Sequence, residues 1–277
     1  MNTSNRDDEV VDGFGKEWNV FNHSGSKAKG LERSFAAYFS IFPWAKLPAQ
    51  AKGFDLGCGS GRWARLVAPN VGELHCIDAS HEALAVARKN LQEIPQVRFH
   101  LASVESIPLP DDSMDFGYSL GVLHHVPDTA AGLAACVRKL RRGAPFLLYL
   151  YYAFDNRPAW FRAIWKVSDW ARCLICGLPF GLKRIVCEVL ATTVYWPSAR
   201  LALAGEAIGL RVGNWPLSAY RKSSFYVMRN DSLDRFGTRL EQRFSRREIE
   251  VMMRQAGLEQ IQFSEAEPFW CALGYKS

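Results

Sequence analysis

The chain has 277 residues, of which 48% are hydrophobic and 22% charged, and its formal net charge is +6. This composition excludes disorder over the whole chain, because there is ample apolar surface to bury, and the length fits one large domain or one domain with an insertion. No apolar run approaches the roughly 20 residues that span a bilayer. The start of the chain has neither the basic nor the apolar region of a signal peptide, so we expect a cytoplasmic protein.

The first part of the chain predicts helices and strands in alternation. Residues 10–42 are amphipathic and predict helix up to Pro43, where the helical pattern ends. Beyond this point, strands that alternate with helices predict a parallel sheet with helices on both faces. We expect strands at 53–56, 73–78, 97–101, 114–120 and 145–151, and helices at 62–68, 81–91 and 129–140.

The alternation stops after the fifth predicted strand. Residues 153–230 are rich in aromatic side chains without a clear strand, and we interpret them as inserted helices and loops. A helix at 245–256, with Ser245 and Glu248 at capping-box spacing, and strands at 261–264 and 271–275 complete the sheet. The predicted organisation is a helical cap at 1–48, a core at 49–152, an insertion at 153–230 and a completion of the core at 231–277.

The positive charge is concentrated in the second half of the chain. Residues 1–130 hold 12 Lys/Arg and 16 Asp/Glu, whereas residues 131–277 hold 22 and 12. Residues 153–222 alone contain 10 Lys/Arg and 4 Asp/Glu. An anionic substrate, a nucleic acid or a membrane surface would each explain this bias, and composition does not choose between them.

A glycine-rich segment follows the first predicted strand and carries the strongest chemical signal. Gly57, Gly59 and Gly61 are spaced G-x-G-x-G, which suits positive φ angles and a close approach of the backbone to a ligand. The spacing differs from the dinucleotide G-x-G-x-x-G, and no Gly-Lys-Ser/Thr of a phosphate loop follows. Asp78 ends the next strand, where a carboxylate can accept both hydroxyls of a ribose. The alternative role for Asp78 is a helix N-cap, for which Ser80 competes.

These residues resemble the class I S-adenosylmethionine-dependent methyltransferases. Asp55-Leu56-Gly57-Cys58-Gly59-Ser60-Gly61 is similar to the first motif of that family, and Asp78 matches its acidic residue after the second strand. The segments 111–116 and 119–126 are similar to its fourth strand and the loop that follows. The resemblance covers residues 50–151 and the closing helix and strands. It implies an α/β fold with a Rossmann-like, doubly wound, seven-stranded sheet and an α-helical, aromatic-rich insertion after strand five.

The resemblance also implies a set of cofactor contacts for S-adenosylmethionine and its product S-adenosylhomocysteine. The glycine loop, including Cys58, would line the methionine part, Asp55 would lie near its amino group, and Asp78 would hold the ribose. Many family members have Asp where this chain has Ser103, so a hydroxyl or backbone groups would have to recognise adenine here. Trp18 is as compatible with a cap over the cofactor as with a core position. The remaining contacts implied are Ala79, Ser103 and Val104 for adenine and Leu120 for methionine and the reactive methyl.

The implied reaction is the displacement of a sulfonium methyl group by an electron-rich atom of an acceptor. The protein would align the two partners and exclude water, and an oxygen nucleophile would also need a base. His124 and His125 follow the fourth strand and are the candidate bases. The alternative is that one of them only packs or orients the loop. We expect no metal site, because the C-x-x-C of Cys173 and Cys176 has no second ligand pair.

The insertion is expected to select the acceptor. Its aromatic rings and arginines would provide stacking faces and anion-binding groups, although a helical subdomain with an aromatic core and a solvated basic face would look the same. The candidate acceptor contacts are Tyr152, Arg157, Trp160 and Tyr226.

Three functions are compatible with the sequence. The favoured one is methylation of an O or N atom of a small molecule, such as a sugar, a lipid-linked compound or a secondary metabolite, anionic acceptors included. An RNA methyltransferase is the second, although no nucleic-acid partner is expected because the chain reads Phe116-Gly117-Tyr118 instead of a motif for base amino groups. The third is a non-catalytic cofactor-binding protein. Peripheral membrane contact is compatible with the basic insertion, and oligomeric state stays open.

Overall fold

The computed structural model describes residues 4–20 and 28–277, and the side chains of residues 16–20, 28 and 29 lie outside this description. The chain forms two compact units. We call Met1–Ala153 together with Leu240–Ser277 the core unit, and Phe154–Arg239 the helical unit. The insertion was predicted to end at residue 230, whereas the helical unit extends to Arg239.

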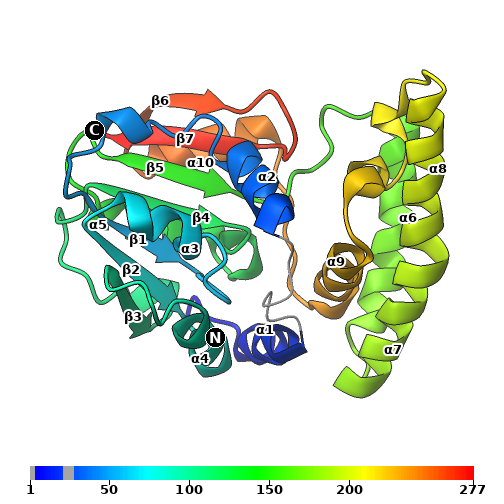
Figure 1. Ribbon diagram of the computed structural model, residues 1–277, viewed down its shortest axis with the longest axis horizontal. Coiled ribbons are helices and arrows are strands. Elements are labelled where there is room, and N and C mark those ends of the chain that lie inside the picture. The colour runs from blue at the N-terminus through cyan, green and yellow to red at the C-terminus, as the bar shows by residue number, and fades with distance from the viewer. Residues whose placement is uncertain (1–3, 21–27) are drawn as a thin grey trace. The chain divides into compact units, whose positions relative to one another are not determined.

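The core unit contains a seven-stranded sheet in the order β3-β2-β1-β4-β5-β7-β6 (Figure 1). Strands β1 to β5 are parallel, and β7 runs antiparallel to both β5 and β6. The order reverses between β1 and β4, which is where open α/β sheets bind ligands at the carboxyl ends of their strands. The strands are β1 (Lys52–Leu56), β2 (Glu73–Asp78), β3 (Val97–Leu101), β4 (Phe116–Leu120), β5 (Pro145–Tyr149), β6 (Leu258–Phe263) and β7 (Cys271–Lys276).

Helices cover both faces of this sheet because its central strands are apolar on both sides. Phe54 and Leu148 pack on one face, with helices α5 and α10. Leu74 and Leu147 pack on the other, with α2, α3 and α4. The helices of the core unit are α1 (Asp8–Val20), α2 (Ala28–Tyr38), α3 (Ala64–Val67), α4 (His81–Asn90), α5 (Thr129–Lys139) and α10 (Arg246–Gln255).

Local signals in the sequence fix the ends of several of these helices. Ser80 and Asp128 cap α4 and α5, each accepting a hydrogen bond from a backbone N–H of the first turn. Ser245 and Glu248 form the predicted capping box of α10. Gly257 follows α10 with a φ of +88°, so the chain reverses there into β6.

The structure corrects some predicted boundaries. The helix expected at 62–68 is only Ala64–Val67, because the chain continues as a 3₁₀ turn that includes Pro69. The strand expected at 261–264 begins at Leu258, directly after the glycine turn. The helical stretch expected at 10–42 is described as α1 and α2, and residues 21–27 between them lie outside the described part.

The helical unit consists of helices and turns without any strand in its described residues. A π-helical turn at Ala191–Tyr195 joins α7 to α8 without a break. Helix α9 packs against α6, α7 and this turn. Within the parts of the chain that are described, no helix combines the length and apolarity needed to cross a membrane. The helices are α6 (Ala159–Ile175), α7 (Phe180–Leu190), α8 (Trp196–Ala207) and α9 (Phe225–Gly237).

Candidate active site

The glycine loop after β1 adopts the backbone conformation that its sequence predicts. The φ angles of Gly57, Gly59 and Gly61 are +75°, +54° and +77°. A Cβ atom on Gly57 would lie 2.3 Å from Val122 Cγ2, and one on Gly61 would lie 2.6 Å from Leu91 Cδ1. Both backbone conformation and space therefore require glycine at these two positions.

Asp78 connects this loop to the end of β2. Its Oδ2 accepts a hydrogen bond from the Gly59 N–H at 2.8 Å, and its Oδ1 accepts one from the Ser80 N–H at 2.9 Å. Ser80, not Asp78, is the N-cap of α4. Burial raises the pKa of Asp78, and the backbone N–H groups of Ser80, Gly59 and Ala79 oppose this shift. Each carboxylate oxygen keeps a lone pair for a further donor, as a ribose diol would require.

Asp55 lies on β1 opposite Tyr118 of β4, and its side chain is almost fully buried. Burial raises its pKa to about 8; the Tyr118 hydroxyl opposes the shift and the charge of Asp78 adds to it. Oδ2 of Asp55 has no hydrogen-bond partner among the described residues. A buried carboxyl oxygen without a donor is suited to a cationic partner, such as an ammonium group. Sequence reasoning missed Tyr118, although the pairing of β1 with β4 would have placed it there.

The other residues expected to contact the cofactor lie around the same edge of the sheet. Ser103 is buried, and its hydroxyl lies 3.2 Å from that of Ser106. Val104 and Leu120 are buried in the two hydrophobic clusters, one on each face of the sheet. Ala79 follows Asp78 and is partly exposed.

Cys58 is buried in the glycine loop, and its pKa is raised well above the ordinary thiol value by the Cys76 side chain and by burial. Its thiol therefore stays protonated at neutral pH. The side chain of Trp18 lies outside the described residues, so its predicted contact stays a prediction.

The first helix lies along this edge of the sheet. Asn5 exchanges hydrogen bonds with Asp128, donating to its carbonyl at 2.8 Å and accepting from its N–H at 2.7 Å. Helix α1 packs against α4, and Gly15 permits this contact because a Cβ there would lie 2.8 Å from Ser80 Oγ. The Phe14 ring lies 4.9 Å from that of His125, so α1 reaches the loops after both β2 and β4.

His124 and His125 lie in the loop after β4 in different surroundings. His124 is fully buried, stacks on Tyr151 with ring centroids 3.9 Å apart, and has no hydrogen-bond partner for either ring nitrogen among the described residues. Burial, together with the charges of His125 and Arg243, lowers its pKa well below the ordinary value, so it is neutral at physiological pH. Nδ1 of His125 lies 2.8 Å from the Leu240 carbonyl, which it bonds as a donor.

Arg243 completes these surroundings and was not singled out by the sequence. Its guanidinium lies 5.1 Å from the centre of the Tyr151 ring. It also bonds to Glu241 at 2.8 Å. Only the tertiary structure reveals the contact of Arg243 with Tyr151, because Arg243 belongs to the distant segment that returns from the helical unit to the sheet.

The four residues expected to bind the acceptor are divided between the two units. Tyr152 belongs to the core unit and packs near Phe269. Arg157 bonds to the Gly213 carbonyl and to Asn214 Oδ1 within the helical unit. Trp160 on α6 is half exposed, and Tyr226 on α9 is partly buried.

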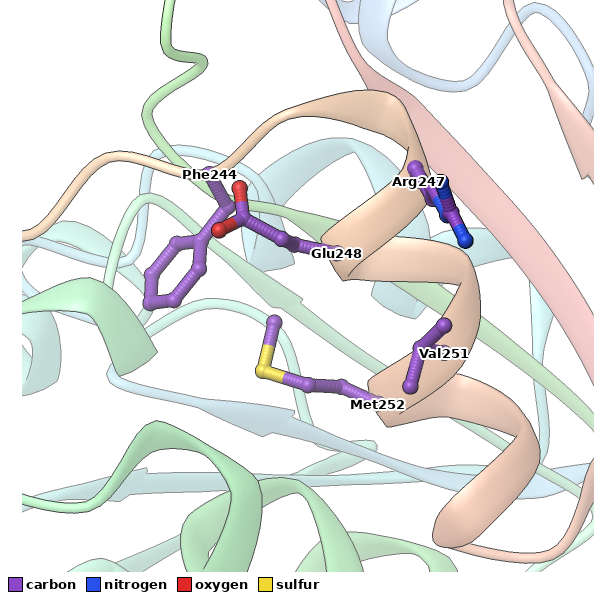
Figure 2. Close-up of a pocket in the computed structure, with 5 residues that line it drawn as sticks. All are labelled: Phe244, Arg247, Glu248, Val251 and Met252. Carbon is purple, nitrogen blue, oxygen red and sulfur yellow. The ribbon is translucent and has the colours of Figure 1, made fainter.

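A shallow pocket of about 290 Å³ lies on helix α10 (Figure 2). The Glu248 carboxylate that lines it already accepts the hydrogen bonds of the capping box. The pocket contains no residue of the glycine loop, of Asp55 or of Asp78, so it is separate from the site described above. Its lining residues are Phe244, Arg247, Glu248, Val251 and Met252.

Comparison with known proteins identifies the core. Residues 54–148 match the family model described as a methyltransferase domain. The chain is 34% identical over 114 residues to the uncharacterized methyltransferase YcgJ of Bacillus subtilis, which covers 40% of this chain and 45% of that protein. It is 37% identical over 91 residues to a ubiquinone biosynthesis O-methyltransferase of Aromatoleum aromaticum, and this match covers 32% of the present chain and 39% of that protein. The chain thus spans less than half of the length of these relatives.

The fold also matches solved structures. A phosphoethanolamine N-methyltransferase 2 of Haemonchus contortus, solved with phosphomonomethylethanolamine and S-adenosylhomocysteine, superposes with a TM-score of 0.52. The sequence identity is 16%, and the match covers 95% of this chain and 47% of that one. At this identity the likeness shows a shared fold.

Proposed function

Because residues 54–148 belong to the class I S-adenosylmethionine-dependent methyltransferase family, we propose that the protein transfers a methyl group from S-adenosylmethionine to an O or N atom of a small-molecule acceptor. The observation that carries the proposal is the pair Asp55 and Asp78 on neighbouring strands, joined to a glycine loop with three positive φ angles. One carboxyl has an oxygen suited to an ammonium group, and the other has lone pairs suited to a diol.

Each side chain of the site then has a role in holding the cofactor. The glycine loop and Cys58 line the methionine part, Asp55 pairs with the ammonium group, and Asp78 accepts the ribose hydroxyls. Ala79, Ser103 and Val104 border the adenine, with the Ser103 hydroxyl in place of the family's carboxylate. Leu120 lies beside the reactive methyl.

The cofactor supplies the activated methyl group, and the chain supplies alignment, exclusion of water and a proton acceptor. We assign the proton acceptor to His124, because its ring nitrogens are unpaired within the described structure. Its burial lowers the pKa and makes the closed form a weak base. His124 is fully buried, so an acceptor has to displace part of its cover, which includes Tyr151 and His125, before the nitrogen is reached. His125, held by the Leu240 carbonyl, orients this loop.

The acceptor is assigned to contacts with Arg157 and Tyr226 of the helical unit. The proposal rests on the aromatic faces and on the net positive charge of the helical unit, which holds 13 Lys/Arg and 6 Asp/Glu. An anionic group on the acceptor would complement this charge. The named relatives act on different acceptors, one through an oxygen and one through a nitrogen, so they leave the atom open.

The direct test uses S-adenosylmethionine with a labelled methyl group and a panel of hydroxylated, amino and phosphorylated acceptors. We expect label in one acceptor class and an equal amount of S-adenosylhomocysteine. With an oxygen acceptor, the kcat of the variant H124N should be about 10²–10⁴-fold lower than that of the wild type, as expected for loss of a general base. Arg157→Gln should raise the acceptor KM, whereas Lys139→Gln, which removes a surface ion pair of the core unit, should leave it unchanged. Cofactor binding without transfer to any acceptor would favour a binding protein over an enzyme.

A further inference from the structure

The helical unit carries an exposed apolar face that its own packing leaves uncovered. Trp160, Ile164, Val167, Trp170 and Leu174 are exposed on α6, and we call these five residues the outer face of α6. Trp170 and Leu174 are each 78% exposed and Val167 is 68% exposed. Their intervals of four, three, three and four residues place them on one side of the helix. Such contiguous apolar surface is typical of an interaction site.

The opposite side of α6 is the one that packs within the helical unit. Arg172 is buried there and donates hydrogen bonds to the carbonyls of Thr238 and Arg239, at the end of α9. The outer face of α6 is therefore not needed for packing within the helical unit, because the opposite side of the helix already makes those contacts.

Cations flank this face, and acidic groups are neutralised. Arg162 and Lys166 are exposed on α6, and no residue of the described chain pairs with either. The acidic residue of α6 is Asp169, and it is bonded to Arg172 at 2.7 Å. Long cationic side chains beside an apolar stripe can extend to a polar boundary while their stems cover apolar surface.

Helix α7, which also packs on α9, repeats this arrangement. Leu182, Ile185 and Val189 are exposed at intervals of three and four residues, and Arg184 is an exposed cation without a partner in the described structure. Its acidic residue, Glu188, forms an ion pair with Arg229. Two helices of one unit thus combine outward apolar residues with free cations and paired acids.

We propose that the outer face of α6, together with the exposed residues of α7, binds the surface of an anionic phospholipid bilayer. Tryptophan and aliphatic side chains would enter the boundary between headgroups and acyl chains, and Arg162, Lys166 and Arg184 would meet the phosphates. A second copy of the chain fits this face less well, because it would bring the same cations together without an acidic partner. The inference is independent of the catalytic proposal, since it needs neither cofactor nor acceptor.

The test is co-sedimentation of the full chain with vesicles of phosphatidylcholine alone or mixed with phosphatidylglycerol. We expect binding to the mixed vesicles, weaker binding to phosphatidylcholine, and a decline with added salt. The double variant Trp170→Glu, Leu174→Glu should reduce binding at least tenfold. The triple variant Arg162→Gln, Lys166→Gln, Arg184→Gln should reduce it by roughly fivefold per charge on the anionic vesicles only.

The control is Val251→Glu, which places one glutamate, against two in the double variant, on an exposed apolar position of α10 in the core unit. It should bind vesicles like the wild type, and circular dichroism should confirm that all variants are folded. Absence of binding by the wild type, or equal binding by the double variant and the control, would overturn the proposal. So would a wild-type dimer that ignores vesicles and becomes monomeric in the double variant, because the face would then join two copies.

Discussion

The core unit and the helical unit treat apolar side chains in opposite ways. In the core unit, both faces of the sheet are covered by helices, and among the described residues only Leu101 and Val251 are large apolar side chains classed as exposed. In the helical unit, α6 to α8 display many of them. The first unit uses its apolar residues to fix the geometry of a site, whereas the second retains them for contact with something outside its own fold.

The largest expected effect tests whether the geometry of the site in the core unit is needed for cofactor binding. Gly57→Ala combines a positive φ with a Cβ 2.3 Å from Val122, so we expect S-adenosylhomocysteine affinity to fall at least about 100-fold, with a loss of stability of several kcal/mol. Gly143→Ala is the matched control, because its φ is also positive but no atom lies within 4 Å. It should cost only about 1–2 kcal/mol and leave calorimetric affinity unchanged. Equal affinities for the two variants would contradict the role of the loop.

The second prediction tests whether the helical unit is stabilised separately from the core unit. Arg172→Ala removes a buried cation that bonds to Asp169 and to two carbonyls, so the free energy of unfolding of the helical unit should fall by about 2–4 kcal/mol. Arg162→Ala changes an exposed arginine of the same helix and should stay within about 0.5 kcal/mol. Denaturation is followed by circular dichroism, and binding of S-adenosylhomocysteine reports on the core unit. Loss of cofactor binding in Arg172→Ala would show that the units are coupled.

The affinity for the cofactor should depend on pH, because burial raises the pKa of Asp55 to about 8. Below this value the free protein holds the carboxyl protonated, and pairing with an ammonium group requires the proton to leave. Affinity should therefore rise with pH between about 6 and 8, by up to tenfold per unit, with proton release on binding. The variant D55N should bind weakly at every pH without this slope, as calorimetry in buffers of different ionisation enthalpy would show.

The same raised pKa has the opposite effect on the free protein. Between about pH 4 and 8 the folded chain retains a proton that the unfolded chain has already released, so this contribution to stability is present at low pH and is lost as the pH rises through 8. A D55N variant should lose that part of the pH dependence. Identical profiles for the two proteins would show that Asp55 is not protonated when the chain is folded.

The smallest effects compare helix caps in the two units. Ser245→Ala removes a reciprocal capping box in the core unit and should cost about 1 kcal/mol. Ser224→Ala removes a single bond of 3.4 Å at the start of α9 in the helical unit and should cost less. Urea denaturation measures both, and a larger loss for Ser224→Ala would mean that α9 depends on its cap more than its packing indicates.

The sequence predicted the core unit well because its signals are local. Strands 73–78 and 97–101 have the predicted bounds, and the glycine loop has the predicted positive φ angles. The position of Tyr118 beside Asp55 depends on the pairing of β1 with β4, and the burial of His124 depends on Tyr151 of a later segment. Neither appears in local spacing. In the helical unit the sequence predicted helices, but it could not tell which aromatic side chains are buried and which lie outside.

The most direct measurement of the central claim is calorimetric titration of S-adenosylhomocysteine into the wild type and Asp78→Asn. The account predicts micromolar affinity for the wild type and a loss of at least tenfold in the variant. That loss should shrink for an analogue without the ribose hydroxyls, because the variant then loses no ribose contact. A smaller loss should remain, because Asp78 also supports the loop through the Gly59 N–H. Absence of binding to the wild type, or an equal loss for both ligands, would contradict the assignment of Asp78 to the ribose.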